Sequence, residues 1–160
     1  MDTNMEKYDV IVAEYPAKNL VGLKVRTSMQ RAAEDCPALW VTFGPRMEEI
    51  PAGDGVRGDF YGVSIMLNAE EFDYWAAVEA EAESAVPEGM ACMEIPAGQY
   101  AKCTVPDLQK LGDALMYLYS EWPKSQREYV PDEEAPGFEL YPANWQETSP
   151  FEVFAPLKRA

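Results

Sequence analysis

Glu14-Tyr15-Pro16-Ala17 recurs 80 positions later as Glu94-Ile95-Pro96-Ala97. Leu39-Trp40-Val41-Thr42-Phe43 is matched, at an offset of 79, by Leu118-Tyr119-Ser120-Glu121-Trp122. The chain has 160 residues, so each copy fills about half of it. Two copies of one structural unit are expected to meet across a pseudo-twofold axis, with a groove between them. The repeat therefore predicts a duplicated fold and also a place for a small-molecule ligand.

Runs of β-branched and aromatic residues between turn residues predict strands. The expected strands are residues 8–14, 20–25, 59–67, 72–82, 90–94, 99–105, 137–141 and 151–157. A first helix is expected at about 28–43, and Pro37 must interrupt, kink or restart it. A second helix is expected at 107–122, because leucines recur there at helical spacing. Residues 124–136 are expected to form a loop.

Each half thus contains strands and one helix that can cover a single face of an antiparallel unit. The expected fold is α+β, built from duplicated strand-helix-strand-strand units. In it an antiparallel sheet carries two helices on one face and a central ligand cleft. The length fits a single domain spanning 1–160, with pseudo-repeats at about 8–83 and 90–158.

The chain contains no histidine, which excludes several kinds of active site. A Ser-His-Asp or Cys-His nucleophile, a histidine general base and an ordinary His-ligated zinc all require that side chain. Gly53-Asp54-Gly55 lacks the third glycine and the strand-to-helix context of a phosphate-binding loop. We therefore expect no metal site and no cofactor, and proton transfer would have to use a carboxylate, a tyrosine or bound water.

The net charge of −15 arises from 13 basic and 28 acidic residues. Nucleic acids are bound by clustered Lys and Arg, so no direct nucleic-acid binding is expected. Solubility explains the charge, and a preference for cationic ligands or basic protein partners is the alternative. No apolar run is long enough to span a membrane. Three cysteines at unrelated spacings and an N-terminus unlike a secretory signal predict a cytoplasmic protein.

The strand Gly137-Phe138-Glu139-Leu140-Tyr141 is the main candidate for chemistry. Because side chains alternate along a strand, Phe138 and Leu140 share one face while Glu139 and Tyr141 share the other. If Phe138 and Leu140 pack beneath the helix, Glu139 and Tyr141 point to the opposite surface, where the groove could form. There Glu139 would be an anionic anchor beside aromatic rings, and the alternative is a solvated strand position.

Aromatic residues elsewhere could supply the walls of the groove. Those on the expected helices are core residues in one interpretation and flat surfaces for aromatic or cationic ligands in the other. Glu79 shares a strand face with Trp75, although the acidic run that contains it is typical of a solvated face. The candidate ligand-binding residues are Glu139, Tyr141, Trp122, Tyr119, Trp40, Tyr61, Trp75, Glu79 and Tyr100.

A series of short motifs, in this order along the chain, resembles the GyrI-like small-molecule-binding family, which is related to the effector-binding domains of AraC- and MerR-type regulators. The motifs are Tyr61-Gly62-Val63, Phe72-Asp73-Tyr74 with Ala77-Val78-Glu79, Ile95-Pro96-Ala97-Gly98-Gln99-Tyr100, Tyr119-Ser120-Glu121-Trp122-Pro123-Lys124-Ser125, Phe138-Glu139-Leu140-Tyr141, and Phe151-Glu152-Val153-Phe154-Ala155-Pro156-Leu157. The quoted motifs lie between residues 61 and 157, and the resemblance extends over residues 8 to 158.

The resemblance implies two repeats around a cleft, in which a glutamate meets cationic, aromatic ligands. By motif position Glu139 looks like that glutamate, Tyr141 like its neighbour and Trp122 like a cleft wall. The chain departs from the pattern where Trp122 is followed directly by Pro123 without the usual leucine, and where Gln126-Arg127 replaces a common glycine. Both departures fall at the expected rim of the cleft and put the ligand specificity in doubt.

Three functions remain open at this point. The first is a binding protein for hydrophobic, aromatic and in part cationic compounds, acting beside a separately encoded regulator. The second is a hydrolase that opens cyclopropane-bearing or other electrophilic compounds, with Glu139 as general base and Tyr141 orienting water or substrate. The third is an acidic inhibitor that binds DNA gyrase.

Overall fold

The structure is a computed structural model that describes residues 8–50, 59–81, 85–146 and 148–160. The strands are β1 (Val10–Tyr15), β2 (Lys18–Ser28), β3 (Phe60–Met66), β4 (Glu71–Glu79), β5 (Ala91–Ile95), β6 (Gly98–Val105), β7 (Tyr129–Pro131), β8 (Gly137–Tyr141) and β9 (Phe151–Arg159). The helices are α1 (Ala32–Phe43) and α2 (Leu111–Met116). The expected loop around Gly53 and the end of the first repeat at 82–83 lie outside the described residues.

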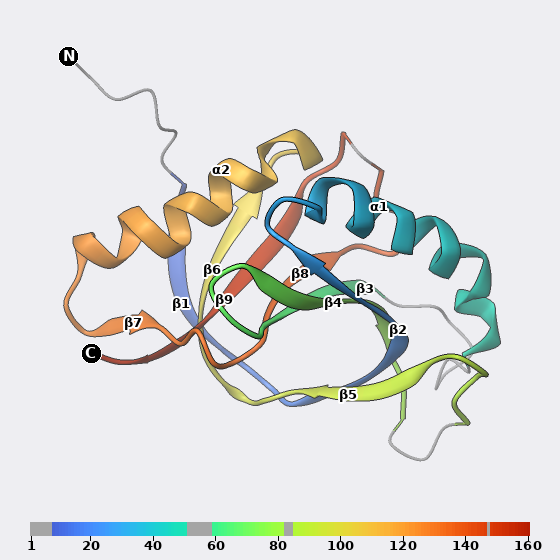
Figure 1. Cartoon of the computed structure of the whole chain (residues 1–160). Coiled ribbons are helices and arrows are strands. Elements are labelled where there is room, and N and C mark those ends of the chain that lie inside the picture. The colour runs from blue at the N-terminus through green and yellow to red at the C-terminus, as the bar shows by residue number, and fades with distance from the viewer. Residues whose placement is uncertain (1–7, 51–58, 82–84, 147) are drawn as a thin grey trace.

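The strands form one antiparallel sheet in the order β1-β6-β9-β8-β3-β4-β2-β5, and β7 pairs with β9 off this path. Both helices stand over the same face of the sheet, α2 above β6 and β9 and α1 above β2 and β4 (Figure 1). This arrangement confirms the predicted fold class of an antiparallel sheet with two helices on one face.

The strand registers reproduce the sequence repeat as a pseudo-twofold arrangement. Tyr15 pairs with Gly98 between β1 and β6, and Lys18 pairs with Ile95 between β2 and β5. An 80-residue shift converts the first pair into the second, because it carries Tyr15 onto Ile95 and Lys18 onto Gly98. The two Pro-Ala turns therefore lie beside each other. Each half of the chain adds an edge strand to the other half, since β1 pairs with β6 and β5 pairs with β2.

Four local expectations were wrong in detail. The first helix continues through Pro37 without a break and begins at Ala32, because β2 extends to Ser28 in register with β4. Pro37 itself is exposed, so water can satisfy the carbonyl that a proline nitrogen leaves unbonded. The second helix is a succession of 3₁₀, α, π and 3₁₀ turns that runs past Pro123 to Ser125. The expected loop at 124–136 contains the short strand β7.

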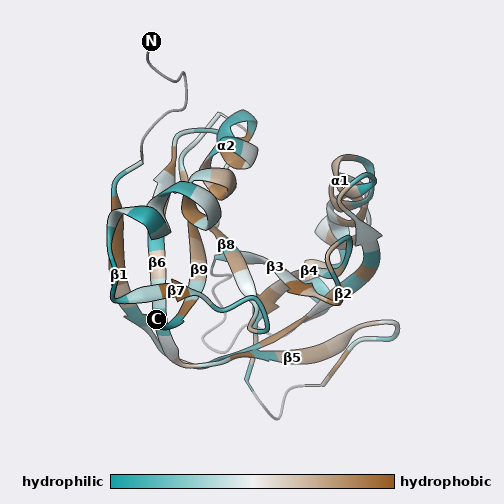
Figure 2. Ribbon diagram, turned by 60° about the vertical axis from the view of Figure 1, so that its left-hand side comes forward, coloured by the Kyte–Doolittle hydropathy of each residue, from teal (hydrophilic) through white to brown (hydrophobic). Residues whose placement is uncertain are grey.

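Apolar side chains cover both faces of the sheet. On the helix face, one cluster joins α2 to β6, β8 and β9, and another joins α1 to β2 and β4. Phe60 and Trp40 contact both clusters, so they connect the two halves beneath the helices. On the other face a third cluster consists of strand residues alone, among them Leu20, Val63 and Phe138. Figure 2 shows β3 and β8 between the two helices, which places them at the centre of the helix face.

Within the described residues, no helix has the length and apolar character needed to cross a membrane.

Candidate functional site

Glu139 lies at the centre of the helix face, on the strand pair that joins the two halves. On β8 it is directly paired with Gly62 of β3. Gly62 and Glu139 occupy equivalent places in the two repeats, because a shift of 77 residues carries Gly62 onto Glu139. The same shift carries Tyr61 onto Phe138 and Val63 onto Leu140. The register is symmetric about this pair, since it pairs Tyr61 with Leu140 and Val63 with Phe138. The carboxylate therefore sits where the pseudo-twofold relation brings the halves together, and its side chain is only 7% exposed.

Three aromatic side chains form a branched hydrogen-bond network around the carboxylate of Glu139. The hydroxyl of Tyr141 donates to Oε1 at 2.5 Å, and the hydroxyl of Tyr74 donates to the same oxygen at 3.1 Å. The indole Nε1–H of Trp40, on α1, donates to the Tyr74 hydroxyl oxygen at 3.0 Å. Tyr74 comes from β4 and Tyr141 from β8, so both halves of the chain contribute to the site.

Burial dominates the electrostatics of this group. Loss of water around Glu139 raises the pKa of its carboxyl to about 7, although the hydrogen bonds from Tyr141 and Tyr74 act in the opposite direction. Burial and the Glu139 charge raise the pKa of both tyrosines, which therefore remain neutral donors at physiological pH. The same two causes raise the pKa of the Cys36 thiol to about 12, so this residue is a poor nucleophile.

The carboxylate has no positively charged partner among the described residues. Both hydrogen bonds end on Oε1, and within the described parts of the chain no donor contacts Oε2. Ionised carboxylates are rarely buried unless a cation or several donors compensate the lost hydration. Among the described residues, only one of the two carboxylate oxygens of Glu139 thus has hydrogen-bond donors. A bound cation or a proton would neutralise the remaining charge.

Aromatic rings surround the carboxylate. Trp40 meets the ring of Tyr141 edge-on at a centroid distance of 6.0 Å, and it lies 6.1 Å from Phe60. Tyr141 is further packed against Trp145 and Phe151, at 4.7 and 4.8 Å. Glu139 itself is only 7% exposed within this aromatic surrounding. An open depression is lined by Asp59, Thr104, Leu140, Pro142, Pro150, Phe151 and Glu152.

The predicted direction of Glu139 was wrong. The alternation was correct, since Glu139 and Tyr141 share a face opposite Phe138. However, Phe138 packs in the cluster made of strand residues alone, while Tyr141 packs with Leu118 and Trp122 beneath the second helix. Glu139 therefore faces the helices, because both faces of the sheet are apolar and the aromatic ring of Phe138 fills the other one.

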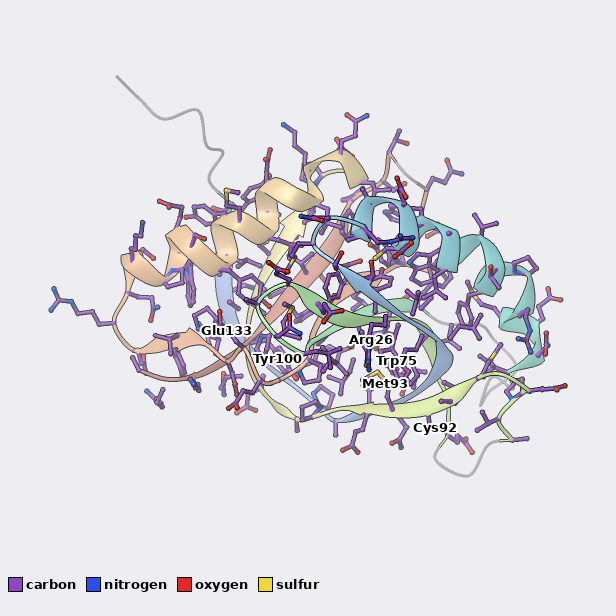
Figure 3. The ribbon with its side chains drawn as sticks, viewed as in Figure 1. Arg26, Trp75, Cys92, Met93, Tyr100 and Glu133 are labelled. Carbon is purple, nitrogen blue, oxygen red and sulfur yellow. The ribbon has the colours of Figure 1, made fainter. Side chains whose placement is uncertain are left out.

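Four of the nine predicted site residues lie on the opposite face, away from Glu139. The hydroxyls of Tyr61 and Tyr15 are hydrogen-bonded at 2.6 Å, and Tyr100 donates to the carbonyl of Pro96 at 2.6 Å. Trp75 packs in the same cluster beneath Lys24, and the exposed Glu79 pairs with Lys18 at 3.3 Å. Figure 3 shows Trp75 and Tyr100 on the side of the sheet away from the helices. The expectation of one groove lined by all nine residues is therefore corrected.

The other predicted residues lie on the helix face. Trp40 and Tyr141 join the network around Glu139, whereas Trp122 is buried in the cluster under the second helix. Tyr119, on the π-helical turn Tyr117–Glu121, is 38% exposed. Burial of its hydroxyl, with the charges of Glu133 and Glu139, raises the pKa of Tyr119 to about 12.

Sequence reasoning missed Tyr74, Gly62 and Trp145 as parts of the site. Alternation places Tyr74 on the strand face opposite Trp75 and Glu79, and the candidate residues were taken from the Trp75 face. Trp145 lies in a segment that reads as a polar loop, where its single large ring was the available signal. For Gly62, a glycine inside a strand pattern was the signal, because it often marks a close approach.

A family model described as Cass2, integron-associated effector binding protein, matches residues 12–157. The transcriptional regulator BrlR of Pseudomonas aeruginosa is 32% identical over 113 residues, which cover 68% of this chain and 40% of BrlR. The chain thus spans about two fifths of the length of this curated relative.

Two solved structures share the fold. An integron cassette protein from the mobile metagenome of Vibrio cholerae superposes with a TM-score of 0.67 at 12% identity, covering 94% of this chain and 97% of that one. SAV2435 bound to tetraphenylphosphonium superposes with a TM-score of 0.65 at 18% identity, covering 96% and 94%. At these identities the similarity establishes the arrangement of strands and helices.

Proposed function

Because this chain belongs to the Cass2 family of integron-associated effector-binding proteins, we propose that it binds hydrophobic, aromatic cations at Glu139, between α1 and α2. The observation that carries the proposal is a buried carboxylate whose two hydrogen-bond partners are neutral tyrosines. A cationic ligand would supply the missing positive charge. Such a pairing is strong in a site from which water is excluded.

The surroundings of Glu139 favour a ligand with aromatic groups. Trp40 and Tyr141 present large rings next to the carboxylate, and such rings attract both aryl groups and diffuse positive charge. The indole of Trp40, on α1, is hydrogen-bonded to the Tyr74 hydroxyl beside Glu139. In this proposal the indole moves away from that hydroxyl when a ligand binds to the carboxylate. The structure of SAV2435 bound to tetraphenylphosphonium makes that cation the natural first probe. The net charge of −15 would further raise the local concentration of cations.

Titration calorimetry of the full chain with tetraphenylphosphonium tests this function. We expect saturable binding of one cation per chain, together with a change in Trp40 fluorescence as its indole leaves Tyr74. Neutral triphenylphosphine oxide, which keeps three aryl rings without the charge, is expected to bind at least tenfold more weakly. Equal affinity for the cation and the neutral compound would contradict the proposal.

Substituting phenylalanine for tyrosine on each face of the sheet distinguishes the site from the far cluster. Tyr141→Phe removes a hydrogen bond that lowers the pKa of Glu139, so less carboxylate is ionised at pH 7. Affinity for tetraphenylphosphonium is expected to fall roughly 3- to 10-fold at pH 7 and to recover by pH 9. Tyr61→Phe is the matched control, because it removes the bond to Tyr15 on the other face. It should cost about 1 kcal/mol of stability and leave the affinity unchanged.

A second candidate function is hydrolysis of an electrophilic small molecule. A carboxyl whose pKa lies at about 7 is suited to act as a general base near neutral pH, and this observation favours the candidate. In that role Glu139 would take a proton from water while the Tyr141 hydroxyl orients the attacking oxygen. The new C–O bond replaces a ring C–C bond of the cyclopropane, and the proton passes from Glu139 to the carbon that keeps the electron pair of the broken bond. Incubation with a cyclopropane-bearing alkylating compound, followed by product analysis, tests it. The same yield of ring-opened product from the wild type and Glu139→Gln would exclude Glu139 as the base.

A further inference from the structure

Gly62 lies directly against the carboxylate of Glu139. A Cβ atom added to Gly62 would stand 2.3 Å from the hydroxyl oxygen of Tyr74 and 2.7 Å from Oε1 of Glu139. Both distances are shorter than the contacts that Cβ atoms make with other atoms in protein structures. The Tyr74 hydroxyl and the Glu139 carboxylate therefore occupy the space that any other residue at position 62 would fill with its own side chain.

The backbone does not explain this glycine. Among the described residues only Gly89 has a positive φ, so Gly62 adopts an ordinary strand conformation that any residue could take. A glycine inside a strand costs conformational entropy and packs no side chain, and it often marks a close approach. Here the approaching groups are two side chains, the Tyr74 hydroxyl and the Glu139 carboxylate, rather than another backbone.

We propose that Gly62 is a positioning residue that sets the depth of the Glu139 carboxylate and thereby selects weakly hydrated organic cations. With no side chain at position 62, the carboxylate and the Tyr74 hydroxyl that donates to it lie close against the backbone of Gly62. A cation must shed its own water to reach that depth. A delocalised or aryl-shielded cation loses little hydration, whereas a primary ammonium ion loses much. The proposal rests on the proposed function, because the ligand is the same cation.

A side chain at position 62 would have to displace both the Tyr74 hydroxyl, which is the nearer group, and the Glu139 carboxylate. The Tyr74 ring is buried, its hydroxyl is bonded to the indole of Trp40, and its Cζ atom would also lie 3.1 Å from the added carbon, so Tyr74 has little room to move. Glu139 is a longer, unbranched side chain with an oxygen that no described donor contacts. Its carboxylate would therefore make the larger movement, out of the position in which it is only 7% exposed.

The Gly62→Ala variant of the full chain tests this inference through two measurements. The first follows the titration of Glu139 by NMR of side-chain ¹³C-labelled protein, with the signal identified by its loss in Glu139→Gln. We expect the midpoint, which burial holds at about 7, to fall by about one pH unit as the carboxylate gains water. The second compares affinities at pH 9, where Glu139 is ionised. The preference for tetraphenylphosphonium over benzylammonium is expected to fall about tenfold.

Two control variants separate positioning from general destabilisation. Gly98→Ala places its Cβ where nothing lies within 4 Å, so it should change neither measurement. Val63→Ala destabilises the same strand from the opposite face, where Val63 is fully buried, and it should leave the midpoint in place. If Gly62→Ala does not fold, Gly62→Ala with Tyr74→Phe removes the closest clashing atom, and the same midpoint is measured against Tyr74→Phe alone.

A midpoint for Gly62→Ala that is unchanged or higher would overturn the inference, whatever the ligand does. If the midpoint falls but the preference between the two cations stays the same, Gly62 does not select the ligand, and that part of the inference is overturned. A wild-type chain that binds neither cation would refute the proposed function. In that case the midpoint alone decides whether Gly62 sets the depth of the carboxylate.

Discussion

Glu139→Gln is expected to reduce the affinity for tetraphenylphosphonium by roughly 30-fold or more, equivalent to about 2 kcal/mol. Glutamine keeps the length and planarity of the side chain and can still accept a hydrogen bond from Tyr141. It has no charge, however, and its amide nitrogen would point a donor at a cation. The aromatic contacts remain, so the loss measures the contribution of the buried charge. Titration calorimetry at pH 8 measures it, since the wild-type carboxyl is ionised there.

Glu79→Gln is the matched control for that substitution. Glu79 is exposed, lies on the other side of the sheet and pairs with Lys18. Its removal takes one negative charge from the chain without touching the site, so the affinity should change by less than about twofold. Equal losses from the two substitutions would show that overall charge, rather than Glu139, attracts the cation. Triphenylphosphine oxide should bind Glu139→Gln and the wild type equally well.

The second large effect concerns stability as a function of pH. The pKa of Glu139 is raised from 4.5 to about 7 in the folded chain, so between these values the folded chain holds a proton that the unfolded chain has released. Rising pH therefore favours unfolding through this group. The contribution of Glu139 to the free energy of unfolding should fall by about 3 kcal/mol as the pH rises from 4.5 through 7 to about 8, and stay constant above that.

Urea unfolding of the wild type and Glu139→Gln at a series of pH values isolates this term. Other carboxyls, such as Asp35 and Glu49, have a lowered pKa and stabilise the fold as pH rises, so only the difference between the two proteins reports on Glu139. Relative to Glu139→Gln, the wild type should lose stability from pH 4.5 to 7. A difference that does not vary with pH would mean that the carboxylate is hydrated in solution.

Much of the fold follows from local patterns in the sequence. The 80-residue repeat predicted the duplicated fold, and all eight expected strands are present with boundaries shifted by a few residues. The main errors arose where tertiary contacts override local preference. β2 continues to Ser28 because its residues pair with β4, and β7 forms because Tyr129–Pro131 has a partner in β9. Neither partner lies nearby in the sequence.

The candidate site was predicted in part. Glu139 and Tyr141 were identified together because residues two apart on a strand share a face. Tyr74 could not be assigned to them, since it lies 65 residues away and joins Glu139 only through the pairing of β4 with β3 and of β3 with β8. The glycine at position 62 indicated a close approach without identifying the groups that approach, because Tyr74 and Glu139 come from the neighbouring strands β4 and β8.

By itself, the sequence determined the duplicated antiparallel architecture, the absence of histidine chemistry and the one glutamate that breaks the equivalence of the halves. The tertiary structure alone decided which way that glutamate points and which aromatics surround it. The physical reason is that both faces of this sheet are apolar. Alternation therefore assigns the residues to two opposite faces, but it does not show which of the two faces the helices cover. Packing of α1 and α2 on one side made that choice, and it left Glu139 buried between the halves without a counter-ion among the described residues.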